Sequence, residues 1–296
     1  MNGIFMKNGV QLRWLNTAGF ELVMSNGKHI LIDPFLSGEI GGLACYPISL
    51  DEIHQCDYLL LSHIHVDHAS DVSVIQKKFP KLNLFVGDLS ADPLCTWQDI
   101  DCARMYRVRS GECYEFDDIR IEAFSGRHSE SPRGYYRKNN YDENGKFMWD
   151  SWFGNLEFLN YLITCCDGTR ILIWGGMTSQ DQMHKFAGTN PDIAIMQVSP
   201  KQDFAEFARL SAVMNAKVII PHHYDFTEKL FEAKPDMLND TSQENREKFV
   251  VNGKFDFEHY MEALGDACRV QNPGATLLKP EHHTWYRFGF CWARVE

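Results

Sequence analysis

The feature that most constrains this chain is a strand-length apolar run that ends in a cluster of histidines. Residues 59–61 are all leucine, and the segment 62–68, Ser-His-Ile-His-Val-Asp-His, follows at once. Alternate side chains of an extended segment point the same way, so His63 and His65 can face one point. Imidazoles and carboxylates are ligands of Zn²⁺, Fe²⁺ and Mn²⁺. The cluster predicts a metal site at the end of a strand, the alternative being a polar loop that happens to be rich in histidine.

Three more segments make this chain similar to the metallo-β-lactamase-fold hydrolases, whose hallmark is His-x-His-x-Asp-His after a strand. Segment 12–37 resembles their opening hairpin and first motif, 119–128 the strand and loop that deliver a third histidine, and 218–225 the loop that delivers the last one. The resemblance implies an α+β fold, the αββα sandwich of that family. Within the family, the chain most resembles the branch that contains ascorbate-6-phosphate lactonase and the N-acylphosphatidylethanolamine phospholipase D enzymes.

The resemblance also implies two neighbouring metal positions. One would be held by the three histidines His63, His65 and His128, and the second by Asp67, His68 and His223. In the family's pattern the last ligand follows proline by two positions, which selects His223 over His222. Asp33 and Thr178 would support the ligands from behind, since a buried carboxylate commonly orients a ligand histidine.

The chain departs from the family at its fourth motif, Gly-Asp-Thr, whose carboxylate bridges two metals. Here residues 175–178 read Gly-Gly-Met-Thr, which puts Met177 at the bridging position. A thioether is a soft, neutral ligand and does not bridge two hard cations. Asp181 lies four residues further on and is the alternative source of a bridge, if the loop folds back. The ion count is therefore one or two, with Zn²⁺ expected and Mn²⁺ or Fe²⁺ as alternatives.

Composition is that of an ordinary globular protein. The chain has 296 residues, 44% of them hydrophobic, and we expect one domain over residues 1–296. A formal net charge of −11 argues against non-specific binding to nucleic acid. We find neither an apolar segment of about 18 residues, as a membrane span needs, nor a signal peptide. Nine cysteines without Cys-x-x-Cys spacing predict mostly buried thiols and a cytoplasmic location. The oligomeric state is left open.

The pattern of apolar residues predicts a mixture of strands and helices. Strands are expected at 11–15, 20–24, 29–32, 58–62, 83–86, 105–109, 119–124, 158–164, 170–174, 192–196 and 217–220. Helices are expected at 70–79, 179–187, 203–215, 242–250 and 256–268. Such a mixture suits two packed sheets with helices outside.

An insertion at about 129–155 follows His128 and is rich in basic and aromatic residues. Long loops of this kind are commonly functional. We expect it to cover the site, the alternative being a flap that only adds stability. Four of its side chains are candidate contacts for a small-molecule substrate, in particular one that carries a phosphate or carboxylate: Arg133, Tyr135, Arg137 and Trp149.

The leading hypothesis is a metal-dependent hydrolase. A cation held by three histidines lowers the pKa of its bound water from about 15.7 to about 7, which gives a nucleophile for an ester, lactone or phosphodiester. Asp67 and His223 are the candidate acid–base residues. One alternative is a mononuclear iron enzyme of oxygen or sulfur chemistry, and another is a non-catalytic ligand-binding protein.

Overall fold

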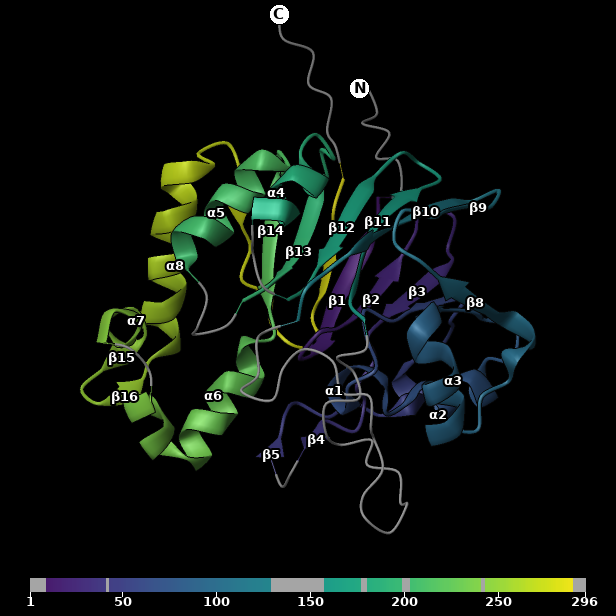
Figure 1. Cartoon of the computed structure of the whole chain (residues 1–296), viewed down its shortest axis with the longest axis horizontal. Coiled ribbons are helices and arrows are strands. Elements are labelled where there is room, and N and C mark those ends of the chain that lie inside the picture. The colour runs from purple at the N-terminus through teal and green to yellow at the C-terminus, as the bar shows by residue number, and fades with distance from the viewer. Residues whose placement is uncertain are drawn as a thin grey trace, which may run out of the picture.

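The strands form two seven-stranded mixed sheets in a computed structural model that describes residues 9–40, 43–128, 157–176, 180–198, 203–240 and 243–289. The first sheet has the order β18 (Trp285–Arg287), β1 (Gln11–Asn16), β2 (Gly19–Val23), β3 (His29–Ile32), β6 (Tyr58–Leu60), β7 (Asn83–Gly87) and β8 (Met105–Val108). The second has the order β17 (Thr276–Leu277), β14 (Val218–His222), β13 (Ile193–Gln197), β12 (Arg170–Trp174), β11 (Leu159–Cys165), β10 (Ile119–Ser125) and β9 (Cys113–Glu115). Two small hairpins, β4 (Glu39–Ile40) with β5 (Leu43–Ala44) and β15 (Val250–Val251) with β16 (Lys254–Phe255), lie outside them. The two sheets pack face to face with helices outside (Figure 1), so the predicted αββα sandwich and all eleven predicted strands are confirmed.

Strand direction decides where the loops of the site meet. In the first sheet β3, β6, β7 and β8 are parallel, and in the second β12, β13, β14 and β17 are parallel. β10 runs the same way as β12, because each is antiparallel to β11. The carboxyl ends of parallel strands lie at one edge of a sheet, which is where open sheets commonly place their ligand-binding loops.

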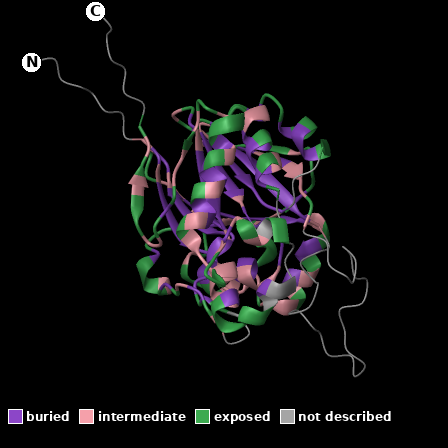
Figure 2. Cartoon of the chain, turned by 90° about the vertical axis from the view of Figure 1, so that its left-hand side faces the viewer, coloured by how far each residue is buried: buried purple, intermediate pink, exposed green. Residues whose placement is uncertain are grey.

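Alternating side chains on the strands separate two apolar cores. On β6, Tyr58 and Leu60 belong to the core between the sheets, whereas Leu59 belongs to the core under the outer helices. On β3, Ile30 and Ile32 face inward and Leu31 faces outward in the same way. This period of two is what a strand with both faces covered requires. Figure 2 shows the result, with buried strands in the middle and exposed residues on the outer sides of the helices.

Two sets of helices cover the outer faces. α1 (Val66–Ala69), α2 (Val72–Lys78) and α3 (Asp88–Trp97) pack on the first sheet, and α4 (Gln180–Phe186), α5 (Phe204–Val213) and α8 (Phe257–Gln271) pack on the second (Figure 1). α6 (Tyr224–Ala233) and α7 (Gln243–Glu247) complete the α-helices of the described residues, which also contain three short 3₁₀ helices, Leu50–Glu52, Cys102–Arg104 and Pro235–Asp240. Asp203 and Asp256 cap α5 and α8 by accepting backbone N–H groups, which is why both starts could be predicted.

α3 and α6 were not predicted, and each lacks a clear signal. α3 contains Pro93, a residue that ordinarily argues against a helix interior. α6 begins after His223, whose side chain makes no capping hydrogen bond. The predicted helix at 70–79 is also shorter than expected, since α1 ends at Ala69 and α2 begins at Val72.

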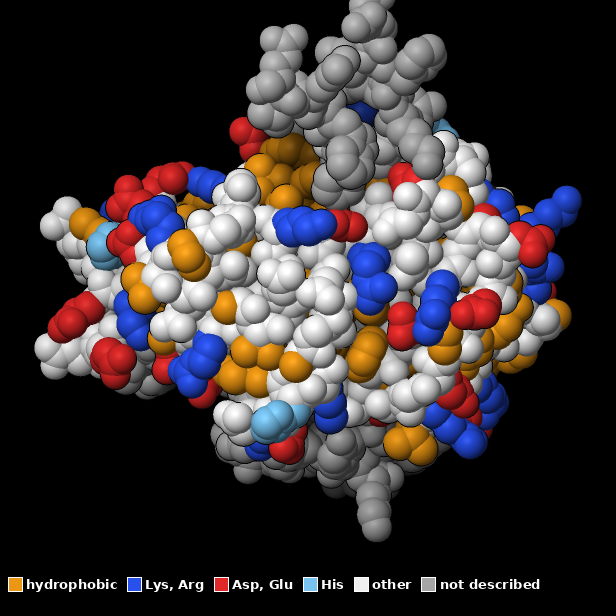
Figure 3. Space-filling model, turned by 90° about the horizontal axis from the view of Figure 1, so that it is seen from above, with side chains coloured by type: hydrophobic (Ala, Val, Ile, Leu, Met, Phe, Trp, Pro, Cys, Tyr) orange, Lys and Arg blue, Asp and Glu red, His pale blue; other side chains and the backbone are white. Residues whose placement is uncertain are grey.

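The surface and the cysteines bear on the compositional predictions. No helix of the described ranges is long and apolar enough to span a bilayer. On the face shown in Figure 3, Lys and Arg side chains are interspersed with Asp and Glu instead of forming a patch of one sign. The prediction that most thiols are buried is wrong for the described part of the chain. Of its eight cysteines only four are buried, namely Cys45, Cys56, Cys165 and Cys268.

The outer core generates a stability prediction. Leu59 is fully buried beneath α2, while Val74 lies on the solvent side of the same helix and is 46% exposed. Leu59→Ala should lower the free energy of unfolding by about 2–5 kcal/mol, because it removes buried methyl groups and leaves a cavity. Val74→Ala, the control, should change it by less than about 0.5 kcal/mol. Urea unfolding measures both, and equal effects would contradict the assignment of the two faces.

Candidate metal centre

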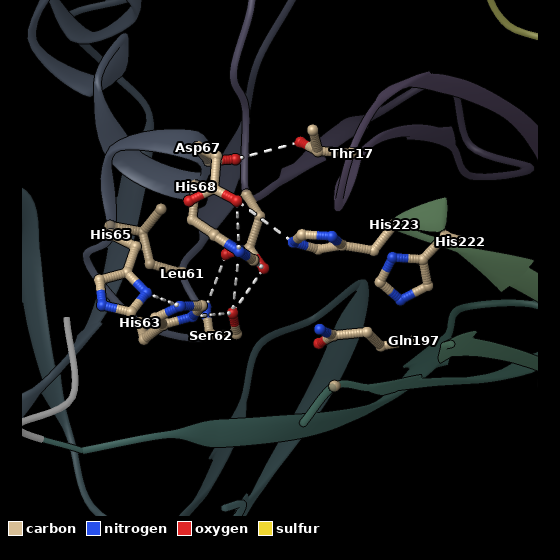
Figure 4. A network of polar contacts seen from close by, with 12 residues as sticks. Thr17, Leu61, Ser62, His63, His65, Asp67, His68, Gln197, His222 and His223 are labelled. Carbon is tan, nitrogen blue, oxygen red and sulfur yellow. Dashed lines mark hydrogen bonds and ion pairs between the residues drawn. The ribbon is translucent and has the colours of Figure 1, made fainter. Parts of the chain in front are cut away.

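Six side chains from three chain segments, which follow β6, β10 and β14, converge at the carboxyl edge of the two sheets. They form two groups, His63 with His65 and His128, and Asp67 with His68 and His223. Within each group the possible ligand atoms all lie within 4.8 Å of one another. These are the two sets that the sequence predicted, drawn in part in Figure 4.

The first group follows from how β6 ends. After Leu60 the chain bends at Ser62 and is extended again at His65, which precedes the single turn of α1. Alternation brings the rings of His63 and His65 to a centroid distance of 4.6 Å, with Nε2 of His63 only 2.9 Å from Nδ1 of His65. The turn of α1 then places Asp67 and His68 in the second group, so one short segment serves both groups.

A buried carboxylate fixes the ring orientation in both groups. Asp33, which is 2% exposed, accepts hydrogen bonds from the Ser62 backbone N–H (2.7 Å) and from Ser62 Oγ (2.5 Å). The single hydroxyl proton of Ser62 goes to the carboxylate, so Ser62 Oγ accepts from Nδ1–H of His63 at 3.0 Å. His68 likewise donates from Nδ1 to Asp33 at 3.0 Å. In both histidines Nδ1 is engaged by these contacts, so Nε2 is the nitrogen that is left to face the centre.

Electrostatics favour neutral rings in the first group. Burial lowers the pKa of His63 well below its usual value, and neighbouring His68, His65 and His128 lower it further. Burial, followed by the neighbouring His128, lowers the pKa of His65 to about 3. A neutral imidazole keeps the lone pair that a metal needs. A divalent cation thus fits this donor set, since nitrogens converge where an added proton is unfavourable.

The second group is organised around an ion pair. Asp67 Oδ2 lies 3.2 Å from Nε2 of His223 and 3.6 Å from Nε2 of His68. Burial would raise the pKa of Asp67, but electrostatic attraction to the nearby His68 and the hydrogen bond from His223 outweigh it and lower that pKa. Burial would lower the pKa of His223, yet the hydrogen bond to Asp67 and its charge raise it.

Thr17 ties the two loops of the second group together. Its hydroxyl donates to the Asp67 carbonyl at 3.1 Å, and its carbonyl accepts from the His223 backbone N–H at 3.1 Å. The Thr17 backbone N–H donates in turn to Asp225, at 2.7 Å. Thr17 and His223 both have positive φ, 42° and 70°, a conformation that non-glycine residues adopt at a cost and often at functional sites.

The aromatic ring of Phe158 packs against two histidines of the first group. Its ring stacks on His63 with centroids 4.7 Å apart and lies 6.0 Å from the ring of His128. A Cβ at Gly126 would come within 2.4 Å of the Phe158 ring, and one at Gly175 within 2.7 Å. The two glycines are therefore required for Phe158 to reach this position.

Other histidines near the centre lie outside both groups. His222 is buried, with its edge against Phe20 and with Nδ1 lacking a hydrogen-bond partner, and burial lowers its pKa to about 3. His282 stacks between Trp14 and Tyr46 at centroid distances of 3.8 and 3.6 Å, and its Nε2 lies 3.1 Å from Asp225.

Several predicted residues do not reach the described centre. Asp181 is exposed on α4 and belongs to neither group, so Asp67 is the only carboxylate of the two groups among the described residues. Six predicted residues, together with the insertion at 129–155, lie outside the residues that the structure describes: Arg133, Tyr135, Arg137, Trp149, Met177 and Thr178. Sequence reasoning missed Ser62, Thr17, Phe158 and Asp225, because their contacts join distant segments and leave no local pattern.

Comparison with known proteins gives a consistent family. A family model described as "Beta-lactamase superfamily domain" matches residues 11–223. A "UPF0173 metal-dependent hydrolase" of Polynucleobacter asymbioticus is 32% identical over 120 residues, 40% of this chain and 42% of that protein. A protein of the same name from Methanobrevibacter smithii is 23% identical over 235 residues, 73% of this chain and 82% of that protein. The crystal structure of the metallo-β-lactamase fold protein YhfI from Bacillus subtilis has a TM-score of 0.59 at 12% identity, covering 95% of this chain and 100% of that chain.

The coverage and identity of these matches limit what can be concluded from them about this chain. Over the first curated relatives the chain spans about half their length, 42–51%. The structural match, at 12% identity, shows the fold alone. The narrower resemblance to the lactonase and phospholipase D branch stays a prediction.

Asp33 provides a test of the network that does not depend on metal. Asp33→Ala leaves the donors of Ser62 and His68 buried without an acceptor, so it should lower the free energy of unfolding by at least about 3 kcal/mol. Urea unfolding in the presence of a chelator measures this without a contribution from metal. Asp181→Ala removes an exposed carboxylate and is the control, and an equally small effect of both would contradict the network.

Proposed function

Because the chain belongs to the β-lactamase superfamily and has the metallo-β-lactamase fold, we propose that it is a metal-dependent hydrolase. The proposed substrate is a small molecule with an ester, lactone or phosphodiester bond. One observation carries the proposal: the ligand atoms of His63, His65 and His128 converge within 4.8 Å. The names of the relatives, "metal-dependent hydrolase", support it.

The first group would hold the catalytic cation. A divalent ion bound there supplies Lewis-acid chemistry and makes a water molecule acidic near neutral pH. Ser62 and Asp33 keep His63 in the tautomer that directs Nε2 at the ion. Phe158 covers one face of the same ring and excludes water from it.

Asp67 and His223 are the proposed acid–base residues. Their side chains are 3.2 Å apart, so the imidazole can carry a proton that the carboxylate stabilises. His223 would donate this proton to the leaving group or to a developing oxyanion. Asp67 would orient His223 and accept the proton of the attacking water. Arg133, Tyr135, Arg137 and Trp149 are the proposed substrate contacts.

We predict that the first group binds metal more tightly than the second. Two dications about 3.5–4 Å apart repel each other by a few kcal/mol even when well screened, and a bridging carboxylate offsets this. Here Met177 replaces that carboxylate in the sequence, and a second ion would also have to break the Asp67–His223 pair. Titration of the chelated protein with Zn²⁺ should show one tight equivalent. Met177→Asp should move the stoichiometry toward two.

The control for this titration is Asp181→Asn, because it removes the other carboxylate that was considered as a bridge. It should leave the first equivalent and the stoichiometry unchanged, since Asp181 is exposed on α4. Uptake of two ions with equal, tight affinity by the unaltered protein would overturn the assignment of Met177.

Activity should depend on the first group. The double substitution His63→Ala/His65→Ala should lower kcat/KM by at least ~10²-fold, since the cation's share of catalysis is several kcal/mol. A panel of p-nitrophenyl esters, a lactone and bis(p-nitrophenyl) phosphate would identify the bond class. His54→Ala alters an exposed histidine and is the matched control. Full activity of the double variant would remove the basis of the proposal.

Elemental analysis of protein purified without added metal separates this proposal from its alternatives. Zinc, or manganese, supports the hydrolase. Iron accompanied by visible absorption would favour the mononuclear iron enzyme instead. Stoichiometric binding of a ligand without turnover would mark a non-catalytic protein.

A further inference from the structure

Two cysteine thiols that belong to neither ligand group lie close together between the loops of the metal centre in the sequence. Cys95 lies in the last turn of α3, and Cys102 begins the short 3₁₀ helix Cys102–Arg104. Both are free, Cys95 half-buried and Cys102 exposed, and their Sγ atoms are 3.3 Å apart. A disulfide bond is about 2.05 Å long, so the two sulfurs need to approach by only about 1.2 Å to form one.

We propose that Cys95 and Cys102 are a redox modification site, a dithiol that a small-molecule disulfide converts to an intramolecular disulfide. The other exposed cysteines in the described part of the chain, Cys113 and Cys166, have no cysteine partner in this geometry. The proposal concerns the thiols alone and stands whether or not the protein is a hydrolase.

The exposed thiol reacts first. The Cys102 thiolate attacks one sulfur of a disulfide such as oxidised glutathione, which forms a mixed disulfide and releases one glutathione thiolate. Cys95 Sγ then attacks Cys102 Sγ and releases the second. Two electrons pass to glutathione disulfide, and the protons of both cysteines end on the two glutathione thiols. Burial raises the pKa of Cys95 to about 11, as does its contact with Cys102, so Cys95 is the poorer nucleophile toward an external disulfide. Its distance of 3.3 Å from Cys102 Sγ favours the second, intramolecular step.

The segment between the two cysteines braces the helices next to the metal centre. Gln98 donates to the carbonyl of Ala69, the last residue of α1, and accepts from the Ser73 backbone N–H at 2.9 Å. Gln76 and Asp101 exchange two hydrogen bonds, of 2.8 and 2.7 Å. Closing the loop from 95 to 102 restricts these residues. Oxidation would therefore tighten the contacts that hold α1.

The sequence allows a direct test by peptide mass. Trypsin cleaves after Lys81 and after Arg104 but nowhere between them, so Cys95 and Cys102 share one peptide that contains no other cysteine. The full-length folded protein is treated with oxidised glutathione, and free thiols are then alkylated. We expect this peptide, 82–104, to lose the mass of two hydrogens and to carry no alkyl group or glutathione. The peptide with Cys113 should carry glutathione or an alkyl group.

Single substitutions distinguish disulfide formation between Cys95 and Cys102 from general reactivity of exposed thiols. In Cys95→Ser the reaction should stop with glutathione on Cys102, whereas Cys113→Ser should leave closure unchanged. Amide hydrogen exchange of the segment 96–101 should slow by ~tenfold on oxidation of the unaltered protein and not in Cys95→Ser. If glutathione or an alkyl group stays on Cys102 of the unaltered protein while Cys113 has reacted, the proposal is wrong.

Discussion

The carboxylate of Asp33 links the end of β3 to the end of β6 and to α1 through hydrogen bonds. It lies after β3, accepts two hydrogen bonds from Ser62 after β6, and accepts a third from His68 in α1. Each donor would be unsatisfied in the apolar surroundings if the carboxylate were absent, and such groups are costly to bury. The backbone of Asp33 has a φ of 41°, so the chain accepts an unfavourable conformation to bring the side chain there. The orientation of His63 in the first group and of His68 in the second depends on this single anchor.

Strand direction explains why ligands distant in sequence meet. The loops after β3, β6, β10, β12 and β14 all leave from strands that point to the same edge of the sandwich. The apolar core then fixes the spacing of the two sheets, because the inner residues of β6 pack against those of the second sheet. A loop from one sheet and a loop from the other can therefore share one centre. The histidine spacing in sequence matters only after this arrangement has formed.

The strands and the ligand groups could be predicted from the sequence because both leave local patterns in it. Apolar runs marked the strands, and the spacing from His63 to His68 marked one segment that serves two groups. Contacts between distant segments carry no such mark. Thr17 and Asp225 are 208 positions apart, yet they share a hydrogen bond of 2.7 Å. α3 was not predicted because it contains Pro93, a residue that argues against a helix interior. α6 was not predicted because the residue before it, His223, has a left-handed conformation and provides no capping hydrogen bond.

The two ligand groups differ in what supports them, and this difference bears on how many ions the protein binds. The first group rests on rigid parts: His63 is fixed by Ser62 and covered by Phe158, which is wedged between two glycines. The second group joins α1 to the start of α6, and Thr17 links the two through its hydroxyl and its carbonyl. Thr17 is held by Asp225, which in turn contacts His282 from the end of the chain. A site whose side chains are already held in place binds more tightly, since fewer groups must be ordered on binding. The architecture thus favours the first group as the primary metal position for reasons independent of the missing bridging carboxylate.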